Sequence, residues 1–488
     1  MTSLMLLPLL TPVVASVFSG VAGWRRLTAV ITLVSALTIL GCGVALGFHV
    51  GDTAHLALGG LLRADALSVT MLIVIGVVGS LATWASIGYV DAELARGDTD
   101  RRGARLYGIL TPAFLAAMAL AVSANNIGVV WVAVEATTVV TAFLVGHHRS
   151  RAALEATWKY VMVCSVGITI AFLGTVLLHF AARHAGAGSE DALHLDVLVA
   201  HAAGLDPAVT RLAGALLLIG YGAKMGLAPF HTWLADAHSQ APAPVSALMS
   251  GVLLSVALSV LIRLKPIIDA AAGPAFLRTA LLAAGLATLL IAALQLTVTA
   301  DLKRMLAYSS METMGLIAVA AAAGTAPAIA ALLLHVLAHG VGKTVLFLAG
   351  GQLQAAHGTT AISEITAVFG RSRLVGGAFA VGMLVLIGLP PFAMFASELA
   401  IALSLADARL AWALAVALVA LVVAFAALIA NSGRMLLGVA TAGGPKIQVP
   451  GTVASALVAG VLVSLALGVT AGPLAGLFAT AATQLGAL

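Results

Sequence analysis

Apolar runs of about 20 residues recur along nearly the whole chain, and they constrain its fold more than any other feature. A run of this length, folded as an α-helix, spans the roughly 30 Å hydrocarbon core of a bilayer. The composition agrees, because 61% of the 488 residues are hydrophobic and only 9% are charged. A soluble domain with this composition would expose an aggregating surface. The sequence therefore predicts an all-α, polytopic membrane bundle.

About fourteen transmembrane helices are predicted within a single integral membrane domain, residues 1–488. Their ranges are 4–22, 27–48, 66–90, 107–124, 127–146, 157–182, 212–234, 243–264, 276–298, 302–322, 327–353, 374–404, 409–437 and 452–480. No basic segment precedes the first run, so we interpret it as a span and not as a cleaved signal. The longest connections, 91–106 and 183–211, are too short to fold as domains.

Lys and Arg are distributed unequally between alternate loops, with about twice as many in one set as in the other. The richer set is Arg25, Arg26, Arg96, Arg101, Arg102, Arg105, Arg149, Arg151, Lys303, Arg304, Arg371, Arg373, Arg434 and Lys446. The poorer set is Arg63, Arg183, Arg211, Arg263, Lys265, Arg278 and Arg409. Cytoplasmic loops carry the excess of Lys and Arg, so we expect both termini outside the cell. Arg263 and Lys265 are expected to extend outward to the interface.

The two cysteines, Cys42 and Cys164, lie in apolar runs. Two thiols cannot ligate a four-thiolate cluster, so we expect neither an iron–sulfur centre nor a disulfide framework in this chain. The net charge of +5 reflects the loop asymmetry, and we expect no nucleic-acid partner.

Lys224 and Pro229 lie in the predicted span 212–234, within the stretch "GYGAKMGLAPFHTWLADAHSQ". An ionisable group near the bilayer centre costs roughly 2.5–3.5 kcal/mol on insertion scales, so it tends to face a partner or a hydrated cavity. Proline interrupts the helix and frees a carbonyl, as in the broken helices of transporters. A desolvated lysine there can exchange its proton near neutral pH. The alternative is a purely structural partner for a glutamate.

Two further spans carry ionisable groups. Glu135 lies in "GVVWVAVEATTVVTAFLV" and is either functional or a carboxyl kept protonated in the core. His335, His339 and Lys343 repeat every fourth residue and share one helical face, which suits a proton relay. The alternatives for this face are a packed polar seam between helices or metal binding. No third metal ligand is evident, so we expect no metal site.

Glu398 follows Pro390 and Pro391 in "IGLPPFAMFASELAIAL", which repeats the arrangement around Lys224 with the opposite charge. Two broken helices, each with an ionisable group, suggest two inverted five-helix repeats. The predicted repeats are 107–264 and 276–437.

Secondary candidates lie near span ends. Asp301, Lys303 and Arg304 begin a span and are either functional or an interfacial anchor, whereas Glu312 lies two turns deeper. Lys159 is explained equally by snorkelling and by function. The group His231, Asp236 and His238 follows the first break, where a proton-entry or capping role is plausible but not required.

These motifs resemble the antiporter-like proton-translocating membrane subunits of complex I, multisubunit Na+/H+ antiporters and membrane-bound hydrogenases. The resemblance covers about 65–437 and rests on "APFHTWLADAHSQAPAPVSALMSG", "DLKRMLAYSS" and "HVLAHGVGK". The first of these and "YSSMETMG" look most like the large membrane subunit of hydrogenase-4 and formate-hydrogenlyase-type complexes.

The resemblance implies a proton path and a cellular setting. Glu135 would pair with Lys224, and His335, His339 and Lys343 would connect to Glu398. The chain would lie in a bacterial or archaeal cell membrane beside other integral membrane subunits. A cytoplasmic hydrogenase-like or dehydrogenase-like module would carry NiFe and Fe–S centres, with no cofactor in this chain.

The chain also departs from the wider family. Several relatives carry a lysine or histidine at the centre of the eighth span, where this chain has Ser255. A serine does not hold a proton as an amine does, so the central link would need water or Lys343. We expect no long lateral helix of the kind found in the distal complex I subunit. A Na+/H+ antiporter subunit and a membrane anchor that has lost coupling remain alternative functions.

Overall fold

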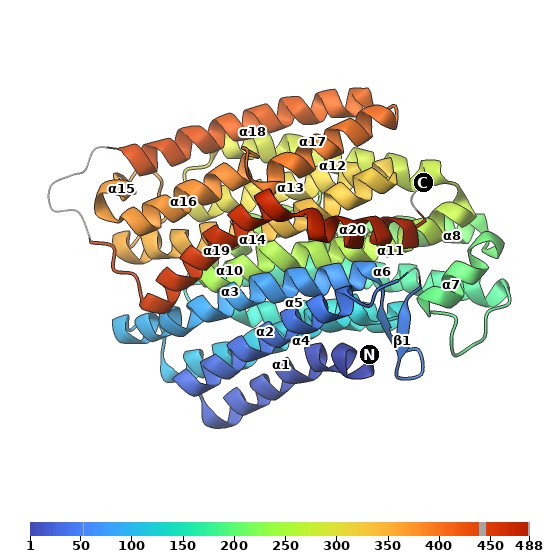
Figure 1. Ribbon diagram of the computed structural model, residues 1–488, viewed down its shortest axis with the longest axis horizontal. Coiled ribbons are helices and arrows are strands. Elements are labelled where there is room, and N and C mark those ends of the chain that lie inside the picture. The colour runs from blue at the N-terminus through green and yellow to red at the C-terminus, as the bar shows by residue number, and fades with distance from the viewer. Residues whose placement is uncertain (52, 439–445, 487–488) are drawn as a thin grey trace.

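The computed structural model describes residues 1–51, 53–438 and 446–486 as one bundle of roughly antiparallel helices (Figure 1). The helices are α1 (Thr2–Ala22), α2 (Arg26–Gly47), α3 (Ala66–Arg96), α4 (Arg101–Ser123), α5 (Ile127–Val145), α6 (Arg151–His184), α7 (Leu195–His201), η1 (Ala202–Gly204), α8 (Pro207–Met225), α9 (Thr232–Gln240), α10 (Ala243–Leu248), η2 (Met249–Leu253), α11 (Leu254–Ala272), α12 (Pro274–Val298), α13 (Leu302–Ala323), α14 (Ala326–His357), α15 (Val368–Arg371), α16 (Arg373–Leu386), α17 (Ala393–Asp407), α18 (Ala411–Leu437), α19 (Gly451–Thr470) and α20 (Gly472–Gln484).

Twelve helices in the described part of the chain, counting α10 to α11 as one, are long and apolar enough to cross a membrane. They match twelve of the fourteen predicted spans, although α19 ends at Thr470 and the remainder of the predicted span 452–480 belongs mostly to α20. The other two predicted spans, 212–234 and 374–404, are each divided between two helices, α8 with α9 and α16 with α17. The predicted all-α membrane bundle is therefore confirmed.

The bundle has a shielded centre and an apolar periphery. The membrane-spanning windows of α3, α10–α11, α13 and α14 are 94–100% buried, whereas those of α1 and α19 are only 28% buried. In Figure 1, α1 and α18 lie at opposite edges of the bundle, with α3 and α14 between them. Side chains on α13 and α14 are thus screened from lipid by other helices.

The two interrupted helices share one backbone pattern. Gly226 and Gly388 have φ values of 76° and 61°, the left-handed conformation that glycine adopts without a Cβ clash. In each case the next amide, of Leu227 or Leu389, bonds back to the carbonyl five residues earlier. The peptide bonds preceding Pro229 and Pro391 are both cis. The segments "GLAPF" and "GLPPF" thus interrupt their helices in the same way.

A second backbone pattern also occurs twice. Asn126, at the start of α5, forms an antiparallel bridge with His194, and Asp301, at the start of α13, forms one with Ala361. Two backbone hydrogen bonds of 2.8–2.9 Å flank each bridge. The side chains of Asn126 and Asp301 both accept a hydrogen bond from the first turn of the helix that follows. The segments after α6 and α14 are therefore tied to the bundle alike.

The structure adds elements within and between the predicted spans. Antiparallel strands β1 (His55–Ala57) and β2 (Leu62–Ala64) precede α3, and α7 with η1 lies within 183–211. The predicted span 243–264 is also not uniform, because η2 is a π-helical turn. There Gly251 meets Gly340 of α14 so closely that a Cβ on Gly251 would lie 3.0 Å from the Gly340 carbonyl oxygen.

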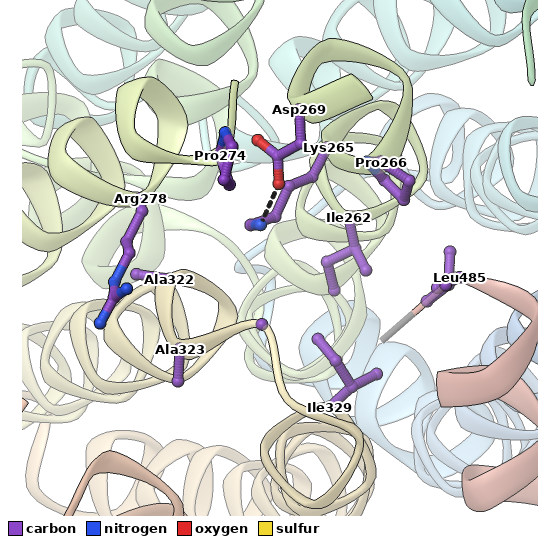
Figure 2. Close-up of a pocket in the computed structure, with 12 residues that line it drawn as sticks. Ile262, Lys265, Pro266, Asp269, Pro274, Arg278, Ala322, Ala323, Ile329 and Leu485 are labelled. Atoms are coloured by element: carbon purple, nitrogen blue, oxygen red, sulfur yellow. Dashed lines mark hydrogen bonds and ion pairs between the residues drawn. The ribbon is translucent and has the colours of Figure 1, made fainter. Parts of the chain in front are cut away.

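Arg263 and Lys265 each have a carboxylate partner within the protein. Arg263 Nη1 lies 2.5 Å from Asp65 Oδ2, and its side chain is only 9% exposed. Lys265 pairs with Asp269 in the wall of a cavity of about 290 Å³ between the ends of α11, α12 and α13 (Figure 2). None of the predicted relay residues lines this cavity.

Candidate functional site

Lys224 lies in the last turn of α8, immediately before the first break, and is fully buried. Its Nζ donates to Thr138 Oγ1 of α5 and to the Tyr160 hydroxyl of α6, both at 2.7 Å. The Tyr160 hydroxyl also bonds Thr141 Oγ1 at 2.5 Å. The buried ammonium therefore has neutral oxygen partners on two neighbouring helices.

Glu135 lies on the same helix as Thr138 and is half-buried. Its Oε1 accepts a hydrogen bond from Ser165 Oγ at 3.0 Å, and its Oε2 has no hydrogen-bond partner among the described residues. No ion pair within 4.0 Å joins Glu135 and Lys224 in the described structure, although the two groups interact electrostatically at longer range. The expected partners are neighbours without direct contact.

Protein groups satisfy part of the backbone at the first break. The Trp233 indole N–H donates to the Ala223 carbonyl, and the Ala228 amide donates to Thr288 Oγ1, both at 2.9 Å. The Trp233 ring also lies 4.9 Å from the Tyr160 ring and 6.1 Å from the His238 ring. Trp233 therefore stands between the surroundings of Lys224 and those of His238.

His335, His339 and Lys343 form one buried face on α14, as the spacing predicts. His335 Nδ1 bonds Ser397 Oγ of α17 at 2.9 Å. Lys343 donates to the Leu306 carbonyl of α13 at 2.7 Å and to Ser309 Oγ. This face of α14 thus connects α13 with α17.

Two carboxyl groups lie around this face of α14. Glu312 of α13 is buried and interacts electrostatically with Lys343 and with Glu398. Glu398, after the second break, is half-buried, and its carboxyl lies against Gly388. A Cβ on Gly388 would be 2.2 Å from Glu398 Oε2. The second break therefore holds its carboxylate directly over the left-handed glycine.

His238 and Lys303 extend the buried group toward the expected cytoplasmic side. Lys303 donates to the Ala241 carbonyl at 2.7 Å. His238 is fully buried, packs against Trp233 and Phe347, and interacts electrostatically with Lys303 and Lys343. Both residues therefore adjoin the face of α14.

Two clusters can now be defined. The Lys224 cluster is Glu135, Thr138, Tyr160, Ser165 and Lys224. The α14 cluster is His238, Lys303, Glu312, His335, His339, Lys343 and Glu398.

The remaining secondary candidates divide between ion pairs and caps. Asp236 pairs with Lys159 at 3.0 Å and with Arg304 at 2.6 Å, and both cationic side chains are nearly half-exposed. Asp301 caps α13 through the Arg304 amide. His231 precedes α9, and its Nδ1 has no hydrogen-bond partner among the described residues.

Ser255 provides no central link by itself. Its Oγ is buried and has no hydrogen-bond partner in the described part of the chain. The nearby π-helical turn connects instead to α13, through a 2.7 Å hydrogen bond between Ser250 Oγ and Ser310 Oγ. These hydroxyls give the centre of the bundle polarity without a titratable group.

Sequence reasoning missed the hydroxyl partners of both lysines, among them Thr138, Tyr160 and Ser309. Thr138 lies one helical turn beyond Glu135, which was a usable signal. Tyr160 and Ser309 come from other helices, and only the tertiary packing brings them to the lysines. Buried Glu93, which bonds His147 and His148, was also missed.

Comparisons with known proteins identify relatives of this chain. The Hydrogenase-4 component F homolog of Methylacidiphilum infernorum is 36% identical over 385 residues, which cover 78% of this chain and 80% of that protein. Hydrogenase-4 component B of Escherichia coli is 26% identical over 349 residues, covering 69% of this chain and 50% of that protein. The chain thus spans between half and four-fifths of these relatives.

Solved structures share the whole fold. A chain of the archaeal membrane-bound sulfane sulfur reductase superposes with a TM-score of 0.89 at 23% identity, covering 99% of this chain and 98% of that one. A chain of the Mrp complex from Dietzia sp. gives 0.86 at 24% identity, with the same coverage. The model of the family described as "NADH:quinone oxidoreductase/Mrp antiporter, TM" matches residues 124–425, a range that includes both clusters. The chain belongs to this family of multi-pass membrane subunits.

Proposed function

We propose that this chain is the proton-translocating membrane subunit of a redox-driven complex of the hydrogenase or NADH-dehydrogenase type. The observation that carries the proposal is the α14 cluster, in which seven titratable side chains from several helices adjoin inside the bundle. Such groups are expensive in a membrane and mark ion pathways. Family membership and the hydrogenase-4 relatives support the same function.

Water completes the proposed path. Both ring nitrogens of His238 and His339, and Nε2 of His335, lack hydrogen-bond partners among the described residues. Buried polar atoms are nearly always satisfied by protein or ordered water. Imidazole can accept and donate a proton near neutral pH. Water between these rings would pass protons from Lys303 and His238 through Lys343 and the α14 histidines to Glu398.

The Lys224 cluster would act as the switch. In the structure the Lys224 ammonium contacts hydroxyls, and Glu135 lies beyond ion-pair distance. At about 4 Å the two opposite charges would attract by about 4 kcal/mol relative to full separation, at an effective dielectric of about 20. That corresponds to about a thousandfold change in proton affinity. Separation of the pair would lower the proton affinity of Lys224, so a movement of a few ångströms would drive proton transfer from Lys224.

The same proposal includes an internal duplication of 107–264 and 276–437. Its support is the repeated backbone pattern at Gly226 and Gly388 and the repeated bridges at Asn126 and Asp301. Each repeat would have five spans, an odd number, so the second would be inverted relative to the first. One repeat would contribute the switch, and the other would contribute most of the relay.

The partners follow from the same function. Other integral membrane subunits and a cytoplasmic hydrogenase-like or dehydrogenase-like module would supply the driving reaction, with NiFe and Fe–S centres in the module. From the excess of Lys and Arg in one set of loops we infer that these loops face the cytoplasm and that both termini lie outside, in a bacterial or archaeal membrane. Co-purification with a tagged chain tests this point. A redox module among the captured subunits supports the proposal, whereas small antiporter subunits alone favour the Na+/H+ antiporter.

The switch is tested with Lys224→Met in the whole complex reconstituted into liposomes. Because methionine carries no proton, we expect redox-driven proton uptake to fall by about tenfold or more. Lys446→Met, at an exposed lysine outside the helices, is the matched control and should behave as wild type. Wild-type proton uptake by Lys224→Met would falsify the switch. Wild-type vesicles that take up no protons during turnover would leave only the anchor function.

A further inference from the structure

A third polar cluster lies outside the proposed proton path. Glu93 is in the last turn of α3, and His147 and His148 follow the end of α5. His148 Nε2 lies 2.8 Å from Glu93 Oε1, and His147 Nε2 lies 3.3 Å from Glu93 Oε2. Each residue offers one atom that can ligate a metal ion, and these three atoms lie within 4.8 Å of one another. Two imidazoles thus converge on one carboxylate.

The burial of the cluster is uneven. The side chains of Glu93 and His147 are 2% and 3% exposed, whereas that of His148 is 29% exposed. Glu93 and His148 line a cavity of about 450 Å³ together with Ser150, Ser239 and Gln354. The three potential ligands therefore form a buried wall with one side open to a polar cavity.

The chemistry of these groups favours a cation. A buried carboxylate between two neutral imidazoles keeps its negative charge, which is costly away from water. Lys303 interacts with Glu93 electrostatically but forms no ion pair with it within 4.0 Å in the described structure. Zn²⁺ and similar borderline ions prefer imidazole nitrogen and carboxylate oxygen. Three protein ligands with one open position are a common arrangement for such ions. The cavity provides room for water as a fourth ligand.

We propose that Glu93, His147 and His148 bind a divalent transition-metal ion, with Zn²⁺ as the best match, where the ends of α3 and α5 meet. The ion ties these two helix ends together at the expected cytoplasmic face. This site uses none of the residues of the proposed proton path, although Lys303 of the α14 cluster interacts electrostatically with Glu93. The competing explanation is a proton on one imidazole, which gives an ion pair without a metal.

The test uses the full chain, purified in detergent through a tag without histidine and stripped with a chelator. Calorimetric titration with Zn²⁺ should show a single tight equivalent for the wild type. Glu93→Gln and His148→Ala should weaken binding by about tenfold or more, because each removes one of three ligands. His184→Ala, at an exposed histidine at the end of α6, is the matched control and should bind as wild type. Zn²⁺ should also raise the thermal unfolding midpoint of the wild type.

A spectroscopic measurement keeps the proposal testable even if a variant fails to fold. Co²⁺ added to the stripped wild-type chain should give the intense visible bands of a four-coordinate ion, and added Zn²⁺ should abolish them. Absence of these bands and of Zn²⁺ binding at micromolar concentration would establish the proton explanation. Binding that is equal in wild type, Glu93→Gln and His148→Ala would also overturn the site, because the metal would then lie elsewhere.

Discussion

Two of the buried lysines, Lys224 and Lys343, occupy different chemical surroundings. Lys224 is held by hydroxyls of Thr138 and Tyr160, whereas Lys343, held by Ser309 and a carbonyl, also adjoins imidazoles and Glu312. Hydroxyls hold an ammonium in place but do not titrate near neutral pH, whereas imidazoles do. The Lys224 cluster therefore suits a switch, and the α14 cluster suits a relay.

The two helix breaks differ in the same sense. Asp236 and Glu398 lie at equal distances along the chain after Gly226 and Gly388. Asp236 forms ion pairs with partly exposed cations, whereas Glu398 is half-buried against its glycine. One backbone design thus serves a surface ion pair in one half and an inner carboxylate in the other.

The largest effect that separates the clusters is expected for His339→Leu. It removes an imidazole with two unpartnered ring nitrogens, so redox-driven proton uptake should fall by about tenfold or more. The free energy of unfolding should stay the same or rise by about 1 kcal/mol, because no hydrogen bond to a described residue is lost. His335→Leu is the matched comparison. It breaks the bond to Ser397 and should lower stability by about 1 kcal/mol. Full proton uptake by His339→Leu would remove that residue from the relay.

A smaller effect should distinguish the two left-handed glycines. Gly388→Ala places a Cβ 2.2 Å from Glu398 Oε2, and Gly226→Ala places one 2.3 Å from Leu234 Cδ1. Each substitution strains a positive φ, so both should lower the unfolding free energy by about 1–2 kcal/mol. Only Gly388→Ala displaces a carboxylate, so only it should reduce proton uptake severalfold. Equal proton uptake by the two variants would show that proton transfer does not depend on the position of the Glu398 carboxyl against residue 388.

The smallest effect is a pH dependence that lies outside both clusters. Burial alone would raise the pKa of Asp65, before α3, but Arg263 and Arg63 hold that pKa well below its usual 3.8. A lowered folded-state pKa adds stability above the unfolded pKa and loses it as the pH falls below about 4. Thermal unfolding between about pH 5 and pH 3 should show this loss, and Arg263→Met should reduce its slope. If Arg263→Met leaves the pH dependence of unfolding unchanged, other carboxylates cause the acid sensitivity.

The sequence predicted the bundle, both breaks and the buried face of α14, because each depends on local chemistry. Apolar length gives the spans, glycine and proline end helices, and the spacing of His335, His339 and Lys343 gives a shared face. The surroundings of these residues depend on tertiary packing. The gap between Glu135 and Lys224, the position of Trp233 and the ion pair between Arg263 and Asp65 arise where distant helices meet. Periodicity within one helix carries no information about such contacts.

The most direct test of the relay is Lys343→Met in the reconstituted complex, measured as protons moved per electron transferred. Lys343 joins α13, Glu312 and the α14 histidines, so its removal should stop proton movement while electron transfer in the partner module continues. A wild-type ratio of protons to electrons in Lys343→Met would contradict the proposed path through α14.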